Sequence, residues 1–133
     1  MSAPTQIPAA LDRAVFSELS AALPHPKIRE LVELFVAETD FYMTEIAARR
    51  AEGDLDSVVR LARNIVAIAG NLGAARASAL ARQLERACRS GDKAGSYRLI
   101  SEMSQACRDA SEDMQAWLNE QPSVLQTARE ASF

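Results

Sequence analysis

The chain has 133 residues, a length that suits one domain, and 48% of them are hydrophobic, enough to form a core. Only 5% are aromatic, and there are five Gly and five Pro, so the composition favours helices packed through aliphatic side chains. The formal net charge of -3 argues against a general nucleic-acid-binding protein, which would need a basic surface.

Neither a membrane segment nor a metal or cofactor site is expected from the sequence. No stretch reaches the roughly 20 apolar residues of a membrane span, and residues 1–10 lack the features of a signal peptide. We therefore expect a cytoplasmic protein without membrane contacts. Cys88 and Cys107 have neither CxxC spacing nor a nearby His, which predicts buried structural thiols. The acidic residues of the second helix have no His at ligand spacing, so we expect no metal.

The first half of the chain predicts two helices after a flexible lead-in at residues 1–8. The first should run from Ala9 to Leu23 and end at the Pro-His-Pro sequence that follows. The second should run from Pro26 to about Glu52, where Gly53 is a good stop signal. The apolar stripe expected on the first comprises Leu11, Val15, Leu19, Ala22 and Leu23. That on the second comprises Ile28, Leu31, Val32, Phe35, Thr39, Tyr42, Met43 and Ile46.

The second half predicts three more helices. The third starts at Leu55 after the N-cap Asp54 and stops at residues 70–73, and the fourth spans Ala74–Ser90. A last long helix ends near residues 121–122, before a loose tail at 122–133. Their expected core stripes are, in order, Leu55, Val58, Ala62, Ile65, Ala69 and Leu72; then Ala77, Leu80, Ala81, Leu84, Ala87 and Cys88; then Tyr97, Ile100, Met103, Ser104, Cys107, Ser111, Met114, Trp117 and Leu118.

The helix pattern predicts an all-α fold over residues 9–121. Short connections between long helices make sequential neighbours antiparallel, which gives an up-down-up-down four-helix bundle. The additional short N-terminal helix should form a lid on one end.

Several segments resemble the histidine phosphotransfer (HPt) domain of two-component signalling, from about Leu11 to Leu118. The segments that carry this resemblance are Leu31-Val32-Glu33-Leu34-Phe35, the turn Glu52-Gly53-Asp54 with Leu55, and Asn71-Leu72-Gly73-Ala74 followed by Leu80, Leu84 and Glu85. The resemblance implies the bundle fold described above and a role in phosphorelay signalling.

The family's signature, His-x-Leu-Lys-Gly-Ser, has its phosphoacceptor His eight residues before the Asn of the turn. Counting back from Asn71 gives Arg63, and the corresponding segment reads Arg-Asn-Ile-Val-Ala-Ile. The guanidinium group stays protonated and offers only donors, so it cannot accept a phosphoryl group. His25 is the only histidine in the chain and is interpreted as an exposed capping or loop residue. The sequence therefore predicts a pseudo-phosphotransfer protein with no catalytic residues.

A partner-binding face is predicted on the second and third helices. In the family, the third helix carries the acceptor on the side that meets the receiver domain. The residues expected on this face are Val59, Arg60, Arg63, Val66, Ala67 and Gly70, with Leu34, Ala37 and Phe41 beside them. Arg63 could reach into the acidic pocket of a receiver. The alternatives are that these helices are buried on a wider face or that the patch forms a homodimer.

The function we expect is that of a non-catalytic adaptor or regulator. It would bind the receiver domain of a response regulator, or a sensor histidine kinase, without carrying phosphate. A structural or homodimeric bundle outside signalling and a phosphotransfer protein with a non-standard acceptor are the alternatives; an enzyme is not expected. Arg82, Arg86 and Arg89, with Glu85 among them, are interpreted as a solvated helix face rather than an anion site.

Overall fold

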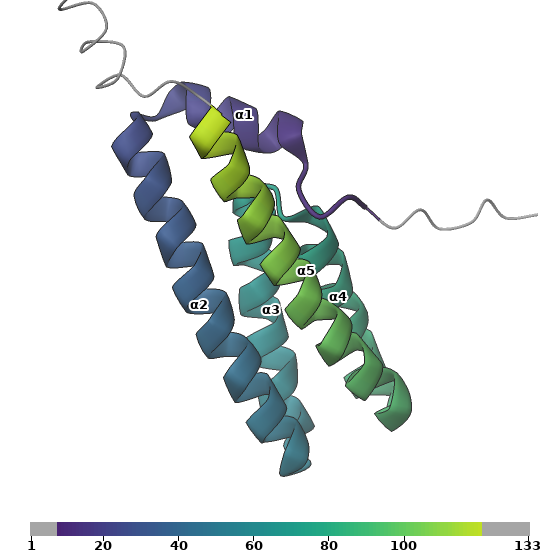
Figure 1. The fold of residues 1–133 in the computed structure, drawn as a ribbon. Coiled ribbons are helices and arrows are strands. Elements are labelled where there is room, and N and C mark those ends of the chain that lie inside the picture. The colour runs from purple at the N-terminus through teal and green to yellow at the C-terminus, as the bar shows by residue number, and fades with distance from the viewer. Residues whose placement is uncertain (1–7, 121–133) are drawn as a thin grey trace, which may run out of the picture.

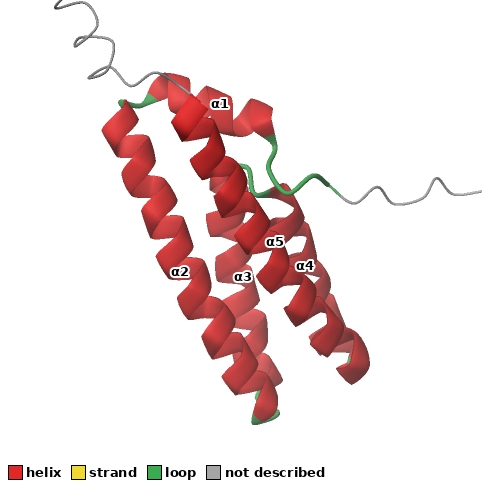
Figure 2. Cartoon of the chain, viewed as in Figure 1, coloured by secondary structure: helices red, strands yellow, loops and turns green. Residues whose placement is uncertain are grey.

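A computed structural model describes residues 8–120, and every regular element within them is a helix (Figure 2). The five helices are α1 (Arg13–Ala22), α2 (His25–Ala51), α3 (Leu55–Leu72), α4 (Ala75–Ser90) and α5 (Lys93–Glu120). The all-α prediction is confirmed. The lead-in and tail predicted at the two ends lie, apart from Pro8, outside the described residues.

The four long helices form an antiparallel up-down-up-down bundle, as predicted (Figure 1). Each packs against two others: α2 against α3 and α5, and α4 against the same two helices. The short helix α1 lies across one end of the bundle, where it contacts α2 and α3. In this view α3 lies behind α2 and α5. Its two neighbours in the bundle are α2 and α4.

Local signals set the ends of the helices. The side chain of Asp12 accepts hydrogen bonds from two backbone N–H groups of the first turn of α1, and Asp54 caps α3 through the N–H of Ser57 at 3.2 Å. Gly73 ends α3 with φ of 84°, a left-handed conformation that glycine adopts without steric penalty. Its carbonyl accepts a bond of 2.7 Å from the N–H of Asp12, which joins the start of α1 to the α3–α4 turn.

The predicted core stripes of α2, α3 and α4 are confirmed almost residue by residue. Of the predicted positions, only Leu31, Tyr42 and Leu55 are half-buried, and all three pack against the core. The buried residues are Ile28, Val32, Phe35, Thr39, Met43 and Ile46 on α2, Val58, Ala62, Ile65, Ala69 and Leu72 on α3, and Ala77, Leu80, Ala81, Leu84, Ala87 and Cys88 on α4. Helical spacing of apolar side chains therefore identifies the inner face of three helices.

The predicted start of the first helix is wrong, and its predicted stripe is partly wrong: Leu11 is buried and Leu19 and Leu23 pack against the core, whereas Ala22 is exposed. The helix begins at Arg13 rather than Ala9, because Asp12 is extended and bonded to the α3–α4 turn. Its fully buried side chain is Phe16, which meets Trp117 of α5 edge-on with ring centroids 5.3 Å apart. Val15, which was predicted in the stripe, is exposed. The fixed start of the helix thus determines which residue points inward.

The predicted stripe of the last helix is partly wrong. Met103, Cys107, Met114 and Leu118 are buried as expected, but Tyr97 is exposed. The other buried positions are Gly95, Ser96, Leu99, Ala106 and Ala110. Because α5 packs against both α2 and α4, its inner face is wide, and small side chains fill the close contacts.

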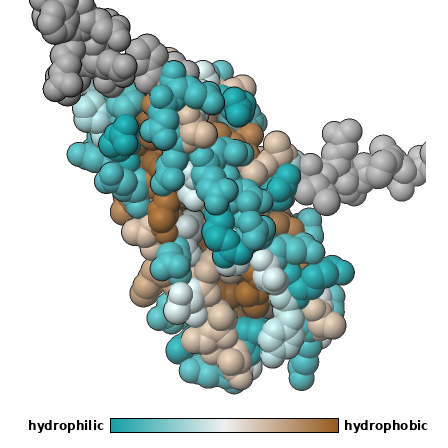
Figure 3. All heavy atoms as spheres, in the orientation of Figure 1, coloured by the Kyte–Doolittle hydropathy of each residue, from teal (hydrophilic) through white to brown (hydrophobic). Residues whose placement is uncertain are grey.

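On the face drawn in Figure 3, hydrophilic atoms predominate and hydrophobic atoms collect in strips between neighbouring helices. Within residues 8–120, none of the helices combines the length and apolarity that crossing a bilayer requires.

Candidate partner-binding surface

Arg63 lies on the outer part of α3 and points toward α4. Its side chain is 56% exposed, and its Nε donates a hydrogen bond to Oε1 of Glu85 on α4. The same oxygen is 3.1 Å from a terminal nitrogen of Arg89, one turn further along α4. Arg63 is thus part of an Arg63–Glu85–Arg89 cluster that joins two helices.

Glu85 is the anionic centre of this cluster. The hydrogen bond from Arg63 is the main cause of its lowered pKa, and the positive charge of Arg89 adds to it, while partial burial acts in the opposite direction. Only 17% of the Glu85 side chain is exposed, although both arginines are more than half exposed. The carboxylate is therefore a fixed, charged acceptor at neutral pH.

Arg60 lies one turn before Arg63 and is also exposed. Its terminal nitrogen donates to Oγ of Ser57 at 2.9 Å, and that hydroxyl donates to the carboxylate of Asp54 at 2.6 Å. The hydrogen bonds that Ser57 donates to Asp54 lower the pKa of that carboxyl group, and the bond from the hydroxyl has a larger effect than the bond from the backbone N–H. Arg60 is thus oriented by the N-cap of its own helix and leaves its guanidinium group open to solvent.

The apolar part of the predicted face on α3 is smaller than expected. Val59 and Val66 are half-buried and pack against the core, and the Val66 carbonyl accepts a hydrogen bond of 3.1 Å from Ser78 of α4. Ala67 and Gly70 are exposed. On α3, these two small exposed residues follow Arg63 by about one and two turns.

The three predicted residues on α2 are all exposed, but they do not line one groove. Leu34 lines an apolar groove of about 250 Å³ between α1, α2 and α3, whereas Ala37 lines a different groove between α2 and α5. Phe41 is 59% exposed and rests edge-on against Tyr42 with ring centroids 5.6 Å apart. The groove with Leu34 is thus the apolar surface that borders α3.

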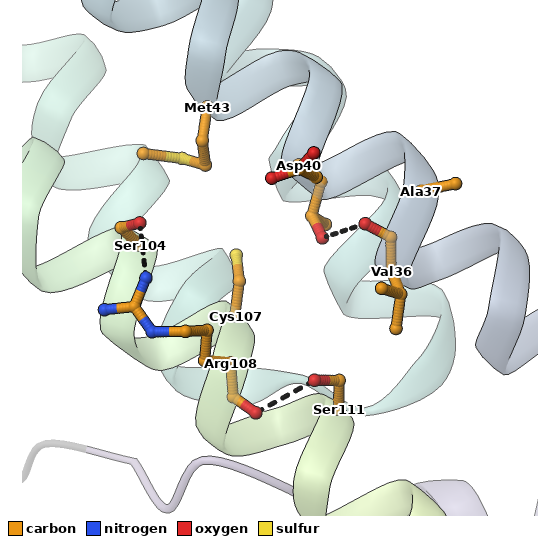
Figure 4. A pocket seen from close by; sticks show the side chains of 9 residues that line it. Val36, Ala37, Asp40, Met43, Ser104, Cys107, Arg108 and Ser111 are labelled. Atoms are coloured by element: carbon orange, nitrogen blue, oxygen red, sulfur yellow. Dashed lines mark hydrogen bonds between the residues drawn. The ribbon is translucent and has the colours of Figure 1, made fainter.

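The α2–α5 groove, with a volume of about 240 Å³, is shown in Figure 4. Cys107 points into the space between the two helices, and Arg108 on its rim donates to the hydroxyl of Ser104 at 3.1 Å. Burial raises the pKa of Cys107 to about 11, so this thiol is protonated at neutral pH. As predicted, both cysteines are buried free thiols.

The sequence predicts His25 to be an exposed capping or loop residue, but the structure places it in a helix and shows it less exposed than expected. It is the first residue of α2 and is half-buried, with Nε2 buried and without a hydrogen-bond partner among residues 8–120. Pro24 and Pro26 on either side allow the helix to start there, because the first turn has no internal partner for its N–H groups. The position is at the end of the bundle, on a different helix from Arg63.

Sequence reasoning missed the roles of Glu85 and Arg89. The i,i+4 spacing of these two residues favours their own ion pair, and that signal is visible in the sequence. The pairing of Glu85 with Arg63 has no such signal, because the two residues are 22 positions apart on different helices.

The model of one protein family, the Hpt domain, matches residues 30–117, from the first turns of α2 to near the end of α5. No curated protein and no solved structure matched the chain. The matched segment contains the whole of α3 and α4, and thus Arg63 and Glu85. The chain belongs to the Hpt domain family, whose members act in phosphorelay signalling and generally interact with receiver domains and histidine kinases.

Proposed function

We propose that this chain is a non-catalytic Hpt adaptor, which binds a receiver domain or a histidine kinase without carrying phosphate. The observation that carries the proposal is Arg63 at the position of the phosphoacceptor. Phosphoryl transfer to nitrogen needs a lone pair, which imidazole has near neutral pH and a protonated guanidinium group lacks. Arg63 is in addition bonded through Nε to Glu85.

His25 is a poor substitute acceptor. Its Nε2 is buried, and it lies in the first turn of α2 rather than on the outer part of α3. An incoming aspartyl phosphate would have to displace the packing at that end of the bundle before it reached the ring. These features support a protein that binds its partner without taking the phosphoryl group.

The charge distribution supports docking of an acidic partner. Together, α3 and α4 carry six Arg and two acidic residues, although the whole chain has a net charge of -3. A receiver domain presents an acidic pocket, so a basic surface of this kind favours its approach and orientation. The exposed Ala67 and Gly70 give such a partner close access to the helix backbone.

A pull-down from the native cytoplasm tests the docking surface. The parent chain is compared with Ala67→Glu and Arg63→Glu, while Ala116→Glu on α5 is the matched control for an exposed Ala replaced by Glu on a helix. Val66 is left unchanged because it is half-buried, and a charge there would disturb folding. We expect a receiver-containing protein or a histidine kinase with the parent and the control, and its loss with both variants at α3.

Radioactive phosphate then tests the absence of transfer. The parent chain is mixed with the recovered kinase and receiver and with ATP, and the label on each protein is followed over time. We expect label on the kinase and the receiver and none on this chain. A stable label on the parent chain would refute the non-catalytic proposal, and recovery of no signalling protein would refute the adaptor proposal.

A further inference from the structure

One carboxylate oxygen serves two arginines. Oε1 of Glu85 accepts from Nε of Arg63 and lies 3.1 Å from a terminal nitrogen of Arg89. Within residues 8–120, the terminal nitrogens of Arg63 make no hydrogen bond, and its side chain is 56% exposed. A partner docked on α3 would therefore meet a guanidinium group that is already half-occupied by an internal anion.

Competition decides whether Arg63 leaves Glu85 for a partner. A single carboxylate of the partner offers Arg63 the same chemistry as Glu85 does, so an exchange between the two gains little. Phosphorylation replaces the single negative charge of that carboxylate with the close to two charges of an acyl phosphate and its three strong acceptor oxygens, which a single carboxylate cannot match. Glu85 therefore separates weakly anionic partners from strongly anionic ones.

Arg89 makes the exchange reversible. When Arg63 turns away, Glu85 keeps an ion pair with Arg89, so the exchange does not leave this mostly buried carboxylate without a cation. Arg86 is on the same helix, but its charge lowers the pKa of Glu85 less than those of Arg63 and Arg89 do, and it forms no ion pair with Glu85 in the described part of the chain. The cluster thus has one arginine that can leave and one that stays.

We propose that the Arg63–Glu85–Arg89 cluster is a phosphorylation-dependent recognition site: Arg63 leaves Glu85 only for a receiver domain whose acceptor carboxylate is phosphorylated. This inference rests on the proposed function, because it assumes that a receiver docks on α3. The phosphoryl group stays on the receiver, and Arg63 only binds it. The chain then binds the phosphorylated state of its partner selectively.

The test uses the receiver domains encoded in the source organism, purified and measured one by one against the intact chain. Each is titrated alone and with beryllium fluoride and Mg²⁺, a non-transferable substitute for the aspartyl phosphate. The parent should bind at least one loaded receiver about tenfold more tightly than the same receiver alone, the size expected for new charge-assisted hydrogen bonds. Arg63→Gln should remove most of this difference and change binding of the unloaded receiver less than about twofold.

Variants at Glu85 test the competition itself. Glu85→Gln should tighten binding of the loaded receiver about two- to fivefold, the effect expected when the ion pair of Glu85 with the exposed Arg63 no longer has to be broken. In the Glu85→Gln variant, Arg63 has lost its partner and is free to bind either form of the receiver. Adding Arg63→Gln to that variant should therefore weaken binding of both the loaded and the unloaded receiver. The matched control is Glu102→Gln, which removes the same charge from an ion pair with Arg98 on α5. Arg89→Gln should weaken loaded binding more than Arg86→Gln does.

Equal affinity for loaded and unloaded receivers would overturn this inference, and so would an Arg63→Gln variant that weakens both forms equally in the parent background. In either case the docking surface and the adaptor function would stand. Binding of no receiver in either state would also overturn the inference, and the pull-down would then decide separately whether the adaptor function survives through a histidine kinase.

Discussion

Replacement of Gly73 by Ala tests how α1 is held on the bundle. Gly73 has φ of 84°, and a Cβ atom there would lie 2.9 Å from the carbonyl oxygen of Asp12 and 3.2 Å from Cβ of Val15. Both contacts are with the start of α1, whose N–H at Asp12 donates to the Gly73 carbonyl at 2.7 Å. The side chain would therefore push away the segment that this hydrogen bond holds.

The magnitude follows from two separate effects. An Ala in the left-handed conformation costs about 1 kcal/mol relative to Gly. The steric contact with backbone at Asp12 adds a further cost, since the hydrogen bond must lengthen or break, and a net hydrogen bond contributes about 0.5–1.5 kcal/mol. We expect Gly73→Ala to lower the free energy of unfolding by about 1.5–2.5 kcal/mol in total.

Gly53→Ala and Gly91→Ala are matched controls. Both glycines end helices with nearly the same φ, 77° and 76°, and a Cβ at either meets nothing within 4 Å. They should show the conformational effect alone, about 1 kcal/mol. Urea unfolding followed by circular dichroism and by the fluorescence of Trp117, the single Trp, measures all three. A Gly73→Ala variant within 0.5 kcal/mol of the controls would refute the steric argument.

Three further predictions concern the acceptor position and the core. The double variant Arg63→His/Ala67→Gly should gain an acid-labile phosphoryl group in the kinase–receiver mixture, and mass spectrometry should locate that group. A variant that stays unlabelled would show that more of the family's motif is needed. Ser96→Ala should lower the free energy of unfolding by about 1–3 kcal/mol, because the buried Arg50 loses the acceptor 2.8 Å from its Nε; exposed Ser101→Ala on the same helix is the control. Stability should fall between pH 9 and about 11, because the unfolded chain ionises its Cys107 thiol first while burial holds the native pKa near 11; Cys107→Ala should flatten that part of the urea-midpoint profile.

The sequence predicts the inner faces of α2, α3 and α4 because large apolar side chains recur there at helical spacing. It is only partly right on α1 and α5, for identifiable reasons. The start of α1 depends on the hydrogen bond between Asp12 and Gly73, which are far apart in the chain. The inner face of α5 includes Gly95 and Ala110. These small residues give a weak hydrophobic signal in the sequence but allow close contacts between helices.

The sequence proposes a position for the site but cannot give its contacts. Counting back eight residues from Asn71, near the end of α3, gives Arg63, and this count needs no structure. Whether Leu34 and Ala37 share a surface depends on where α3 and α5 pack around α2, and the structure puts them in different grooves. Likewise, the pairing of Arg63 with Glu85 depends on how α3 and α4 are rotated against each other, which local periodicity does not fix.

The contacts of Arg63 and Glu85 also bear on whether Arg63 has a structural role or a recognition role. If the pair served stability alone, its value would be small, since Arg63 is more than half exposed and surface ion pairs are weak. Glu85 already has a second partner in Arg89, so the bundle does not need Arg63 to neutralise it. An exposed guanidinium group with an internal partner that it can leave at little cost is well suited to reversible contact with an anion. The geometry thus favours a recognition role for Arg63 over a purely structural one.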